Sequence, residues 1–247
     1  MTVSIRRGVR ALALSLFFLV LAGASDVRAT SITVGTFSGG NCYPFMCNDS
    51  GTDVGPSLDY QQVYSADAFG HPLQITSIDW YFDSTDGGSP IVLGGDYAFS
   101  WGYAPAGSVN NLDPNLLSYS GGPFSLGTMS VPAGGADYGA LLTLNGFAPF
   151  VYDPSLGDLL LEVAVSNQDN VPNYSANGYN QEDDAGVATS RAFYLQGVIN
   201  YADNVGLVTT FNGDTVPEPS SLLLLGGGLV ALVKGRRRLG IRYERRR

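Results

Sequence analysis

Apolar and polar residues alternate with a period of two along several stretches between residues 30 and 215. Such alternation places one side of a β-strand on a core and the other side toward water. The alternating apolar residues are Ile78, Trp80 and Phe82; Tyr97, Phe99, Trp101 and Tyr103; Leu159, Leu161, Val163 and Val165; Phe193, Leu195 and Ile199; and Leu207 and Phe211. No stretch of this region carries a long apolar period of 3.6 residues, so we predict an all-β domain.

Turn-forming residues separate these stretches. Glycine adopts positive φ angles without steric cost, and asparagine tolerates them. Such residues occur at Asp86-Gly87-Gly88, Gly94-Gly95, Gly121-Gly122-Pro123, Gly134-Gly135 and Asn177-Gly178. Many short strands between turns predict a β-sandwich or jelly roll for residues 30–215. Residues 166–188 are rich in Asn, Asp and Glu, and we predict that they form one long exposed loop.

The N-terminus has the layout of a secretory signal peptide, a basic segment followed by a short apolar one. The basic residues are Arg6, Arg7 and Arg10, and the uncharged run extends from Ala11 through Ala24. A run of about 14 residues is short of the roughly 20 that a membrane-spanning helix needs. We therefore predict a signal helix within residues 1–29, with a retained anchor and twin-arginine export as alternatives.

Two small-x-small cleavage sites are present in this region, Ala22-Gly23-Ala24 and Val27-Arg28-Ala29. We prefer the second site because strand-like sequence, Ser31 to Val34, starts directly after it. The mature chain is then predicted to begin near Thr30.

The C-terminal segment, residues 216–247, combines three features in order. Pro217-Glu218-Pro219 is followed by an uncharged apolar stretch, residues 222–233, and then by a basic cluster of Lys234, Arg236, Arg237 and Arg238. A helix of about 12 residues is about 18 Å long, against a hydrocarbon core of about 30 Å. Basic residues after an apolar helix halt translocation and stay on the cytoplasmic side. We therefore predict a stop-transfer role for the cluster.

These three features resemble the PEP-CTERM sorting signal, and the resemblance covers only this tail. It implies that an exosortase, an inner-membrane cysteine protease, recognises the Pro217–Pro219 motif and cleaves near it. It also implies an inner-membrane-anchored precursor and delivery to the cell surface or beyond, often beside exopolysaccharide. The same segment is also known as an ice-binding-protein C-terminal domain. That label implies nothing about ice here, because residues 30–215 contain no repeated Thr-x-Thr ladder. An ordinary single-pass anchor is the alternative.

Charge is distributed very unevenly along the chain. Of the 13 Lys and Arg residues, four lie at or before Arg28 and eight at or after Lys234, which leaves only Arg191 between them. Of the 22 acidic residues, all but Asp26, Glu218 and Glu244 lie within residues 30–215, so 19 acids and one base give this region a net charge of −18. A nucleic-acid partner is excluded, because phosphate binding requires Lys and Arg.

The two cysteines, Cys42 and Cys47, lie close together and are followed by oxygen-rich sequence. In an exported protein such a pair predicts a disulfide across a small loop. Asp49 and Asp53 then offer carboxylate oxygens, the ligands that calcium prefers, so a structural calcium ion is one interpretation and an ordinary turn is the other. We predict no other cofactor.

Candidate chemistry elsewhere is sparse. His71 is the one histidine and follows Gly70 in turn-like sequence, no Gly-x-Ser-x-Gly elbow occurs, and residues 30–215 contain no lysine. Paired carboxylates about 5–9 Å apart are the remaining route to catalysis, as in glycosidases. Tyrosines in loop-like sequence could instead stack on sugar rings; these are Tyr60, Tyr64, Tyr174 and Tyr179.

The sequence therefore predicts an exported bacterial surface or extracellular-matrix protein with a non-enzymatic binding or structural role. Its expected partners are an exosortase, the inner membrane during transit, and extracellular polysaccharide. The alternative from a different class is a secreted carbohydrate-active hydrolase that uses two carboxylates.

Overall fold

A computed structural model of the chain describes residues 28–37, 39–41, 43–45, 58–83, 91–92, 94–110, 117–131, 134–135, 141–167, 179–183, 188–195 and 199–216. All of these residues belong to one compact unit, Arg28–Val216. The predicted signal helix and the predicted helix over residues 222–233 lie outside the described residues. No helix within the described ranges has the length and apolar character required to cross a bilayer.

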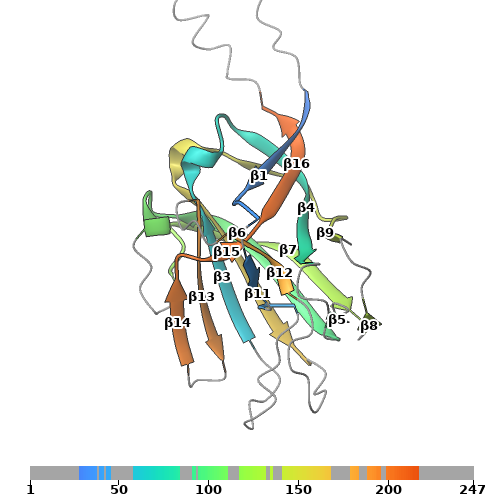
Figure 1. The fold of residues 1–247 in the computed structure, drawn as a ribbon. Coiled ribbons are helices and arrows are strands. Elements are labelled where there is room, and N and C mark those ends of the chain that lie inside the picture. The colour runs from blue at the N-terminus through green and yellow to red at the C-terminus, as the bar shows by residue number, and fades with distance from the viewer. Residues whose placement is uncertain are drawn as a thin grey trace, which may run out of the picture. The chain divides into compact units, whose positions relative to one another are not determined.

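Two antiparallel sheets and a small two-stranded ribbon make up this unit (Figure 1). The eight-stranded sheet contains β1 (Ala29–Val34), β2 (Gly39–Asn41), β4 (Leu73–Asp83), β9 (Leu141–Leu144), β10 (Phe150–Tyr152), β12 (Tyr179–Asp183), β15 (Gly206–Leu207) and β16 (Thr209–Thr215). The six-stranded sheet runs in the order β14 (Ile199–Asp203), β13 (Thr189–Leu195), β3 (Leu58–Tyr64), β11 (Asp158–Ser166), β6 (Gly95–Ala104) and β7 (Gly121–Val131). The ribbon pairs β5 (Ile91–Val92) with β8 (Gly134–Gly135).

The helical elements of the described residues are three short 3₁₀ turns, η1 (Ala66–Ala68), η2 (Ser108–Asn110) and η3 (Pro154–Leu156). The predicted all-β sandwich is therefore confirmed. One prediction about its loops is wrong, because part of the expected 166–188 loop forms β12, which pairs with β2, β4 and β15. That pairing consists of backbone hydrogen bonds, and residues 179–183 carry no hydrophobic alternation that would reveal a strand.

The inward sides of both sheets meet in one core, as the alternation predicts. Trp80 of β4 stacks on Phe99 of β6 with 5.8 Å between ring centroids, and Tyr64 of β3 packs edge-on against Phe211 of β16 at 4.9 Å. All four side chains are buried. Aromatic pairs at these distances contribute about 0.5–1.5 kcal/mol beyond the area that they bury, so they join the two sheets specifically.

Leu160 departs from the expected pattern. Its position in the alternation of β11 puts its side chain on the face away from the core. It is nevertheless fully buried, in a second apolar cluster with Val63, Ala104 and Val109. Leu117 and Tyr119 pack against this cluster from the segment that follows η2. This part of the outer face of the six-stranded sheet is therefore covered by the chain itself.

The short segment between the two cysteines adds an aromatic plug to the core. Phe45 is fully buried, with its ring centroid 5.3 Å from that of Trp80 and 5.6 Å from that of Tyr97. Tyr43 stacks on Phe193 at 4.6 Å. Cys42 and Cys47 lie outside the described residues, so their disulfide stays a prediction. The segment does more than close a local loop, because its middle residues pack between the sheets.

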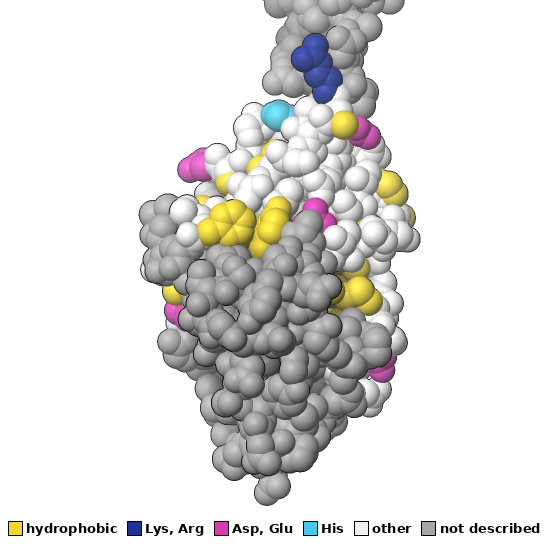
Figure 2. All heavy atoms as spheres, turned by 45° about the vertical axis from the view of Figure 1, so that its right-hand side comes forward, with side chains coloured by type: hydrophobic (Ala, Val, Ile, Leu, Met, Phe, Trp, Pro, Cys, Tyr) yellow, Lys and Arg dark blue, Asp and Glu magenta, His cyan; other side chains and the backbone are white. Residues whose placement is uncertain are grey.

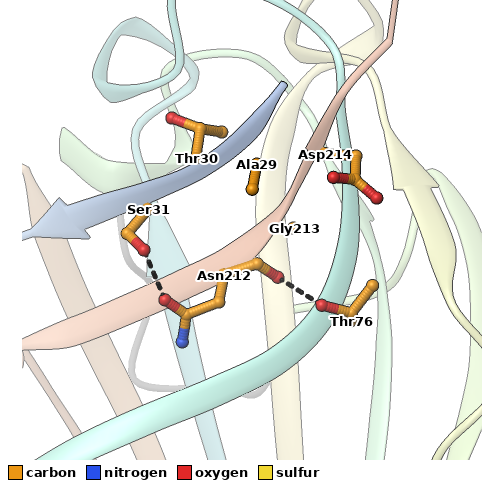
Figure 3. A pocket seen from close by; sticks show the side chains of 7 residues that line it. All are labelled: Ala29, Thr30, Ser31, Thr76, Asn212, Gly213 and Asp214. Atoms are coloured by element: carbon orange, nitrogen blue, oxygen red, sulfur yellow. Dashed lines mark hydrogen bonds between the residues drawn. The ribbon is translucent and has the colours of Figure 1, made fainter. Parts of the chain in front are cut away.

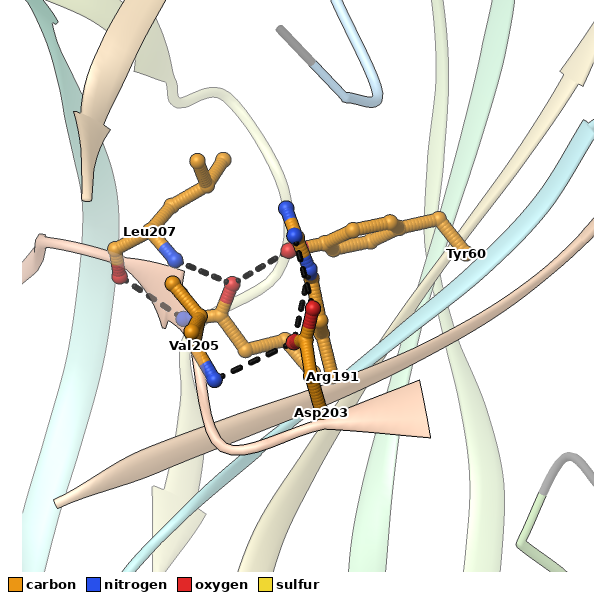
Figure 4. A network of polar contacts seen from close by, with 6 residues as sticks. Tyr60, Arg191, Asp203, Val205 and Leu207 are labelled. Atoms are coloured by element: carbon orange, nitrogen blue, oxygen red, sulfur yellow. Dashed lines mark hydrogen bonds and ion pairs between the residues drawn. The ribbon is translucent and has the colours of Figure 1, made fainter. Parts of the chain in front are cut away.

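Polar contacts link β3 to β15 and β13 to β14 (Figure 4). Gln62 accepts hydrogen bonds from the Tyr60 hydroxyl at 2.8 Å and the Leu207 N–H at 2.9 Å, and donates to the Leu207 carbonyl at 2.7 Å. Arg191 forms a bidentate pair with Asp203, through Nε and Nη2 at 2.9 Å each. Because buried polar groups need partners, this network fixes how β3, β13, β14 and β15 meet.

Asp158 is the most deeply buried acid among the described residues, at 2% exposure. Its two carboxylate oxygens accept the backbone N–H of Ala66 at 3.0 Å and that of Val109 at 3.3 Å. One carboxylate therefore holds both η1 and η2 against the start of β11. This role is structural, and it places Asp158 inside the fold rather than at a surface site.

Replacing Phe45 by alanine should lower the free energy of unfolding by about 3–5 kcal/mol, because it removes a large buried ring and leaves a cavity. Denaturant unfolding of the exported protein measures this change. The matched control is Leu156→Ala, which truncates a side chain that is 63% exposed and should change the free energy by about 0.5 kcal/mol or less. Equal midpoints for the two variants would contradict the role of Phe45 as a core plug.

Candidate functional site

The outer side of β1, β16, β4 and β9 carries short polar side chains in two rows. Register aligns Thr33, Thr210, Asp79 and Thr143 across the four strands, and Ser31, Asn212 and Ser77 across three of them. We call these seven residues the polar face. Residues of the opposite parity, such as Ile78 and Phe211, are buried in the core. The face is therefore a direct consequence of strand alternation.

Hydrogen bonds link the side chains of the polar face from strand to strand. Asn212 is central, since its amide donates to Asp79 Oδ2 at 2.6 Å and to Ser77 Oγ at 3.2 Å, and its carbonyl oxygen accepts from Ser31 at 2.5 Å. Thr143 donates to Asp79 Oδ1 at 2.7 Å. The hydroxyls of Thr33 and Thr210 lie 2.7 Å apart. The face is thus a pre-organised array of hydroxyl, amide and carboxylate groups.

A β-bulge interrupts the pairing of β4 with β16 at one end of this face. Register shifts between Asn212 and Gly213, so that Thr76 becomes the extra residue, and its hydroxyl donates to the Asn212 carbonyl at 3.2 Å. A Cβ at position 213 would lie 1.9 Å from the Gln74 carbonyl oxygen. Only glycine permits this close approach, and bulges of this kind re-aim side chains near sites.

The bulge borders a shallow pocket of about 370 Å³ (Figure 3). Its lining residues come from β1, β4 and β16 and are Ala29, Thr30, Ser31, Thr76, Asn212, Gly213 and Asp214. Ser31 and Asn212 belong to both the pocket and the polar face, so the two form one continuous surface. The lining offers hydroxyl, amide and carboxylate groups and no base.

An aromatic pair flanks the polar face on its other side. Tyr81 of β4 bonds through its hydroxyl to the Thr210 hydroxyl at 2.5 Å. Phe37, which follows β1, packs edge-on against Tyr81 at 5.1 Å and remains 54% exposed. A half-exposed ring beside a row of hydroxyls offers both an apolar surface and hydrogen-bonding groups to one ligand.

Among the residues of the polar face and the pocket lining, the charged side chains are Asp79 and Asp214, and Arg28 directly precedes the lining residue Ala29. Lys and Arg among the described residues are Arg28 and the buried, paired Arg191. Figure 2 shows one face of the domain, where acidic side chains lie singly among uncharged ones. Asp79 and Asp214 supply negative charge at the polar face and the pocket. Such a surface suits uncharged or positively charged ligands better than anions.

The outer face of the six-stranded sheet is a poorer candidate. Tyr119 lies over Gly102, where an added Cβ would come within 2.3 Å of its ring. Burial raises the pKa of Tyr119 to about 12, and the neighbouring Glu162 adds to the rise. Glu162 itself accepts a hydrogen bond from Gln61 at 2.7 Å. The acid and the tyrosine on this face are therefore engaged in packing.

Most residues singled out from the sequence lie outside the described part of the chain. These are Cys42, Cys47, Asp49, Asp53, Tyr174, Pro217, Glu218, Pro219, Lys234, Arg236, Arg237 and Arg238. Their predicted roles in disulfide formation, calcium binding and sorting stay predictions. Within the described ranges, no three His, Cys, Asp or Glu side chains are grouped as metal ligands would be. His71 is exposed in a turn, as predicted.

The prediction that Tyr60 and Tyr64 lie in loops and could stack on sugars is wrong. Both are in β3, at 2% and 0% exposure, and they form part of the core. Tyr179 is in β12 rather than a loop. The aromatic residues that do reach solvent beside the polar face are Phe37 and Tyr81; the alternation around Trp80 places Tyr81 on the outward side, whereas nothing in the sequence pattern pointed to Phe37.

A family model for the PEP-CTERM protein-sorting motif matches residues 215–238. The matched range contains the Pro217–Pro219 triplet and the basic cluster, and the predicted resemblance is therefore confirmed. The motif marks the chain as an exported protein that is targeted to an exosortase by way of a membrane-anchored precursor. It covers the tail and carries no information about the polar face.

Other similarities are weak. No curated protein matches the chain. A chain in the structure of infectious bursal disease virus Gx strain is similar to it at 13% identity, with a TM-score of 0.21 over 87% of this chain and 51% of the viral one. This chain thus spans about half the length of that viral chain. A likeness at this level supports no inference about fold or function.

Gly213→Ala should lower the free energy of unfolding by about 1–3 kcal/mol, because the new Cβ clashes with backbone that cannot move without disturbing the bulge. Denaturant unfolding measures the effect. Gly70→Ala is the matched control, since nothing lies within 4 Å of a Cβ at that position. If both variants unfold at the same denaturant concentration, the close approach at Gly213 does not exist in solution.

Proposed function

We propose that this exported protein has a non-enzymatic role and that its polar face binds a neutral polysaccharide outside the cell. The single observation that supports this most strongly is the array of Ser31, Thr33, Asn212, Asp79 and Thr143 on one side of a rigid sheet. Serine and threonine hydroxyls both donate and accept hydrogen bonds, as sugar hydroxyls do. After bonding to one another, these groups retain unused lone pairs for a ligand.

The flanking aromatic pair supports the same class of ligand. A sugar ring has an apolar face and a polar rim, so it is matched by an exposed aromatic ring beside hydroxyl and amide groups. Phe37 and Tyr81 supply the ring surface, and the polar face supplies the hydrogen-bonding groups. Rigid placement by strands also limits the entropy lost when the ligand binds.

Charge narrows the choice of polysaccharide. The region from residue 30 to residue 215 carries 19 acids and one base, and that base, Arg191, is buried in a pair with Asp203. A polymer rich in uronic acids or sulfate would be repelled by Asp79 and Asp214, and neither the seven residues of the polar face nor the pocket lining includes Lys or Arg; Arg28 precedes the lining residue Ala29. A neutral chain meets neither obstacle. We therefore assign the face to uncharged polysaccharide.

Delivery to the outside is consistent with this role. The sorting motif directs the precursor to an exosortase at the membrane. A domain released or displayed there meets extracellular polysaccharide. Many weak contacts along one polysaccharide molecule would retain the protein. The surface or matrix location is thus part of the same proposal.

The test is affinity electrophoresis of the exported protein in gels that contain the neutral exopolysaccharide of the producing cell. Asn212→Ala should weaken retardation about 5- to 10-fold in apparent Kd, because it removes the hydrogen bonds that organise the face. Asn167→Ala is the matched control, since Asn167 is exposed at the end of β11 and bonds to Asp96. A melting curve of each variant confirms that it folds.

A second pair of variants tests whether the exposed aromatic pair beside the polar face contributes to binding. Phe37→Ala should reduce retardation, whereas Phe124→Ala, which removes a ring that is 49% exposed on the other sheet, should not. Unchanged retardation for both Asn212→Ala and Phe37→Ala would refute the assignment of the site. A fall in polymer length during incubation would instead refute the non-enzymatic role and favour the hydrolase.

A further inference from the structure

The first and last strands of the domain are held together at their outer ends. The Thr215 N–H donates to the Arg28 carbonyl at 2.9 Å, and the Arg28 N–H donates to the Thr215 hydroxyl at 3.2 Å. Ala29 pairs with Asp214, and the Val216 N–H donates to the Pro72 carbonyl at 3.0 Å. We call these contacts the terminal clasp. As a result, β1 begins and β16 ends at the same end of the domain (Figure 1).

The clasp adjoins the sorting motif without a spacer. The match to the motif starts at Thr215, which is the last residue of β16, and Pro217 follows Val216 directly. The motif follows the domain in the chain, so every strand that pairs with β16 has already been exported when an exosortase reaches the motif. Because proteases bind an extended, unpaired chain, the clasp withholds Thr215 and Val216 from cleavage.

The clasp also distinguishes the two candidate sites for signal peptide removal. Cleavage after Ala29 would remove Arg28, and with it both hydrogen bonds to Thr215, and would delete the Ala29 wall of the pocket. Cleavage after Ala24 leaves Ser25, Asp26 and Val27 ahead of the clasp and preserves every contact. Its residues Ala22-Gly23-Ala24 also match the A-x-A pattern of such sites.

We propose that both processing cuts fall outside the terminal clasp, after Ala24 at the N-terminus and after Pro217 or a later residue at the C-terminus. The mature domain then retains Arg28–Val216 intact. Whatever an exosortase leaves or attaches at the C-terminus then follows Val216 in the chain, and Val216 directly follows the last residue of β16. This proposal does not depend on the identity of the polysaccharide.

Mass spectrometry of the protein recovered from outside the cell tests both ends at once. We expect an N-terminal peptide that begins at Ser25 and a C-terminal peptide that ends at Pro217 or a later residue. A chain that begins at Thr30, or one that ends at or before Val216, overturns the proposal.

Two precursor deletions test whether the clasp matters to the domain. Removing residues 25–27 places Ala24 next to Arg28, whereas removing residues 25–29 places it next to Thr30; both keep the same signal peptide and cleavage motif. The first exported product should melt as the unaltered protein does. The second should melt about 2–6 °C lower, because two backbone hydrogen bonds of Arg28 are lost. Equal melting temperatures for the two products would refute the clasp.

Discussion

The rest of the structure depends on the insertion of β16 between β1 and β4. This strand is the last of the domain, and it pairs on one side with the first strand and on the other with the longest strand of its sheet. Its inward residue Phe211 packs against Tyr64 of the opposite sheet, which closes the core. Its outward residues Thr210 and Asn212 complete the rows of the polar face. Folding and the candidate site therefore require the same strand.

A shortage of cations explains how the rest of the domain is stabilised. With Arg191 as the sole base between residues 30 and 215, apolar burial and uncharged hydrogen bonds must replace ion pairs. Gln62, Asn212 and the Thr33–Thr210 pair are examples, since each joins neighbouring strands without a formal positive charge. The same composition leaves the polar face open to uncharged ligands.

The sequence predicted features that repeat locally and missed those that depend on distant pairing. Alternation identified Ile78, Trp80 and Phe99 as inward residues, and the tail motif was found because its parts are contiguous. Tyr60 and Tyr64 were wrongly predicted to lie in loops. Gln61 and Gln62 between them are polar but buried, so the sequence of β3 does not show the alternation of apolar and polar residues. Alternation placed Asp79 on the outward side, but the rows of the polar face were not predicted, since they join residues such as Thr33 and Thr210 that lie 177 positions apart.

The central claim is that the outer side of the β1–β16–β4–β9 sheet is the ligand surface. The most direct measurement is the shift of side-chain amide resonances in the ¹⁵N-labelled exported protein as neutral exopolysaccharide is added. The account predicts that the Asn212 amide resonances move with polymer concentration, whereas those of Asn167, on the other sheet, stay fixed. Binding that leaves the Asn212 resonances unchanged, or that moves both residues alike, would contradict it.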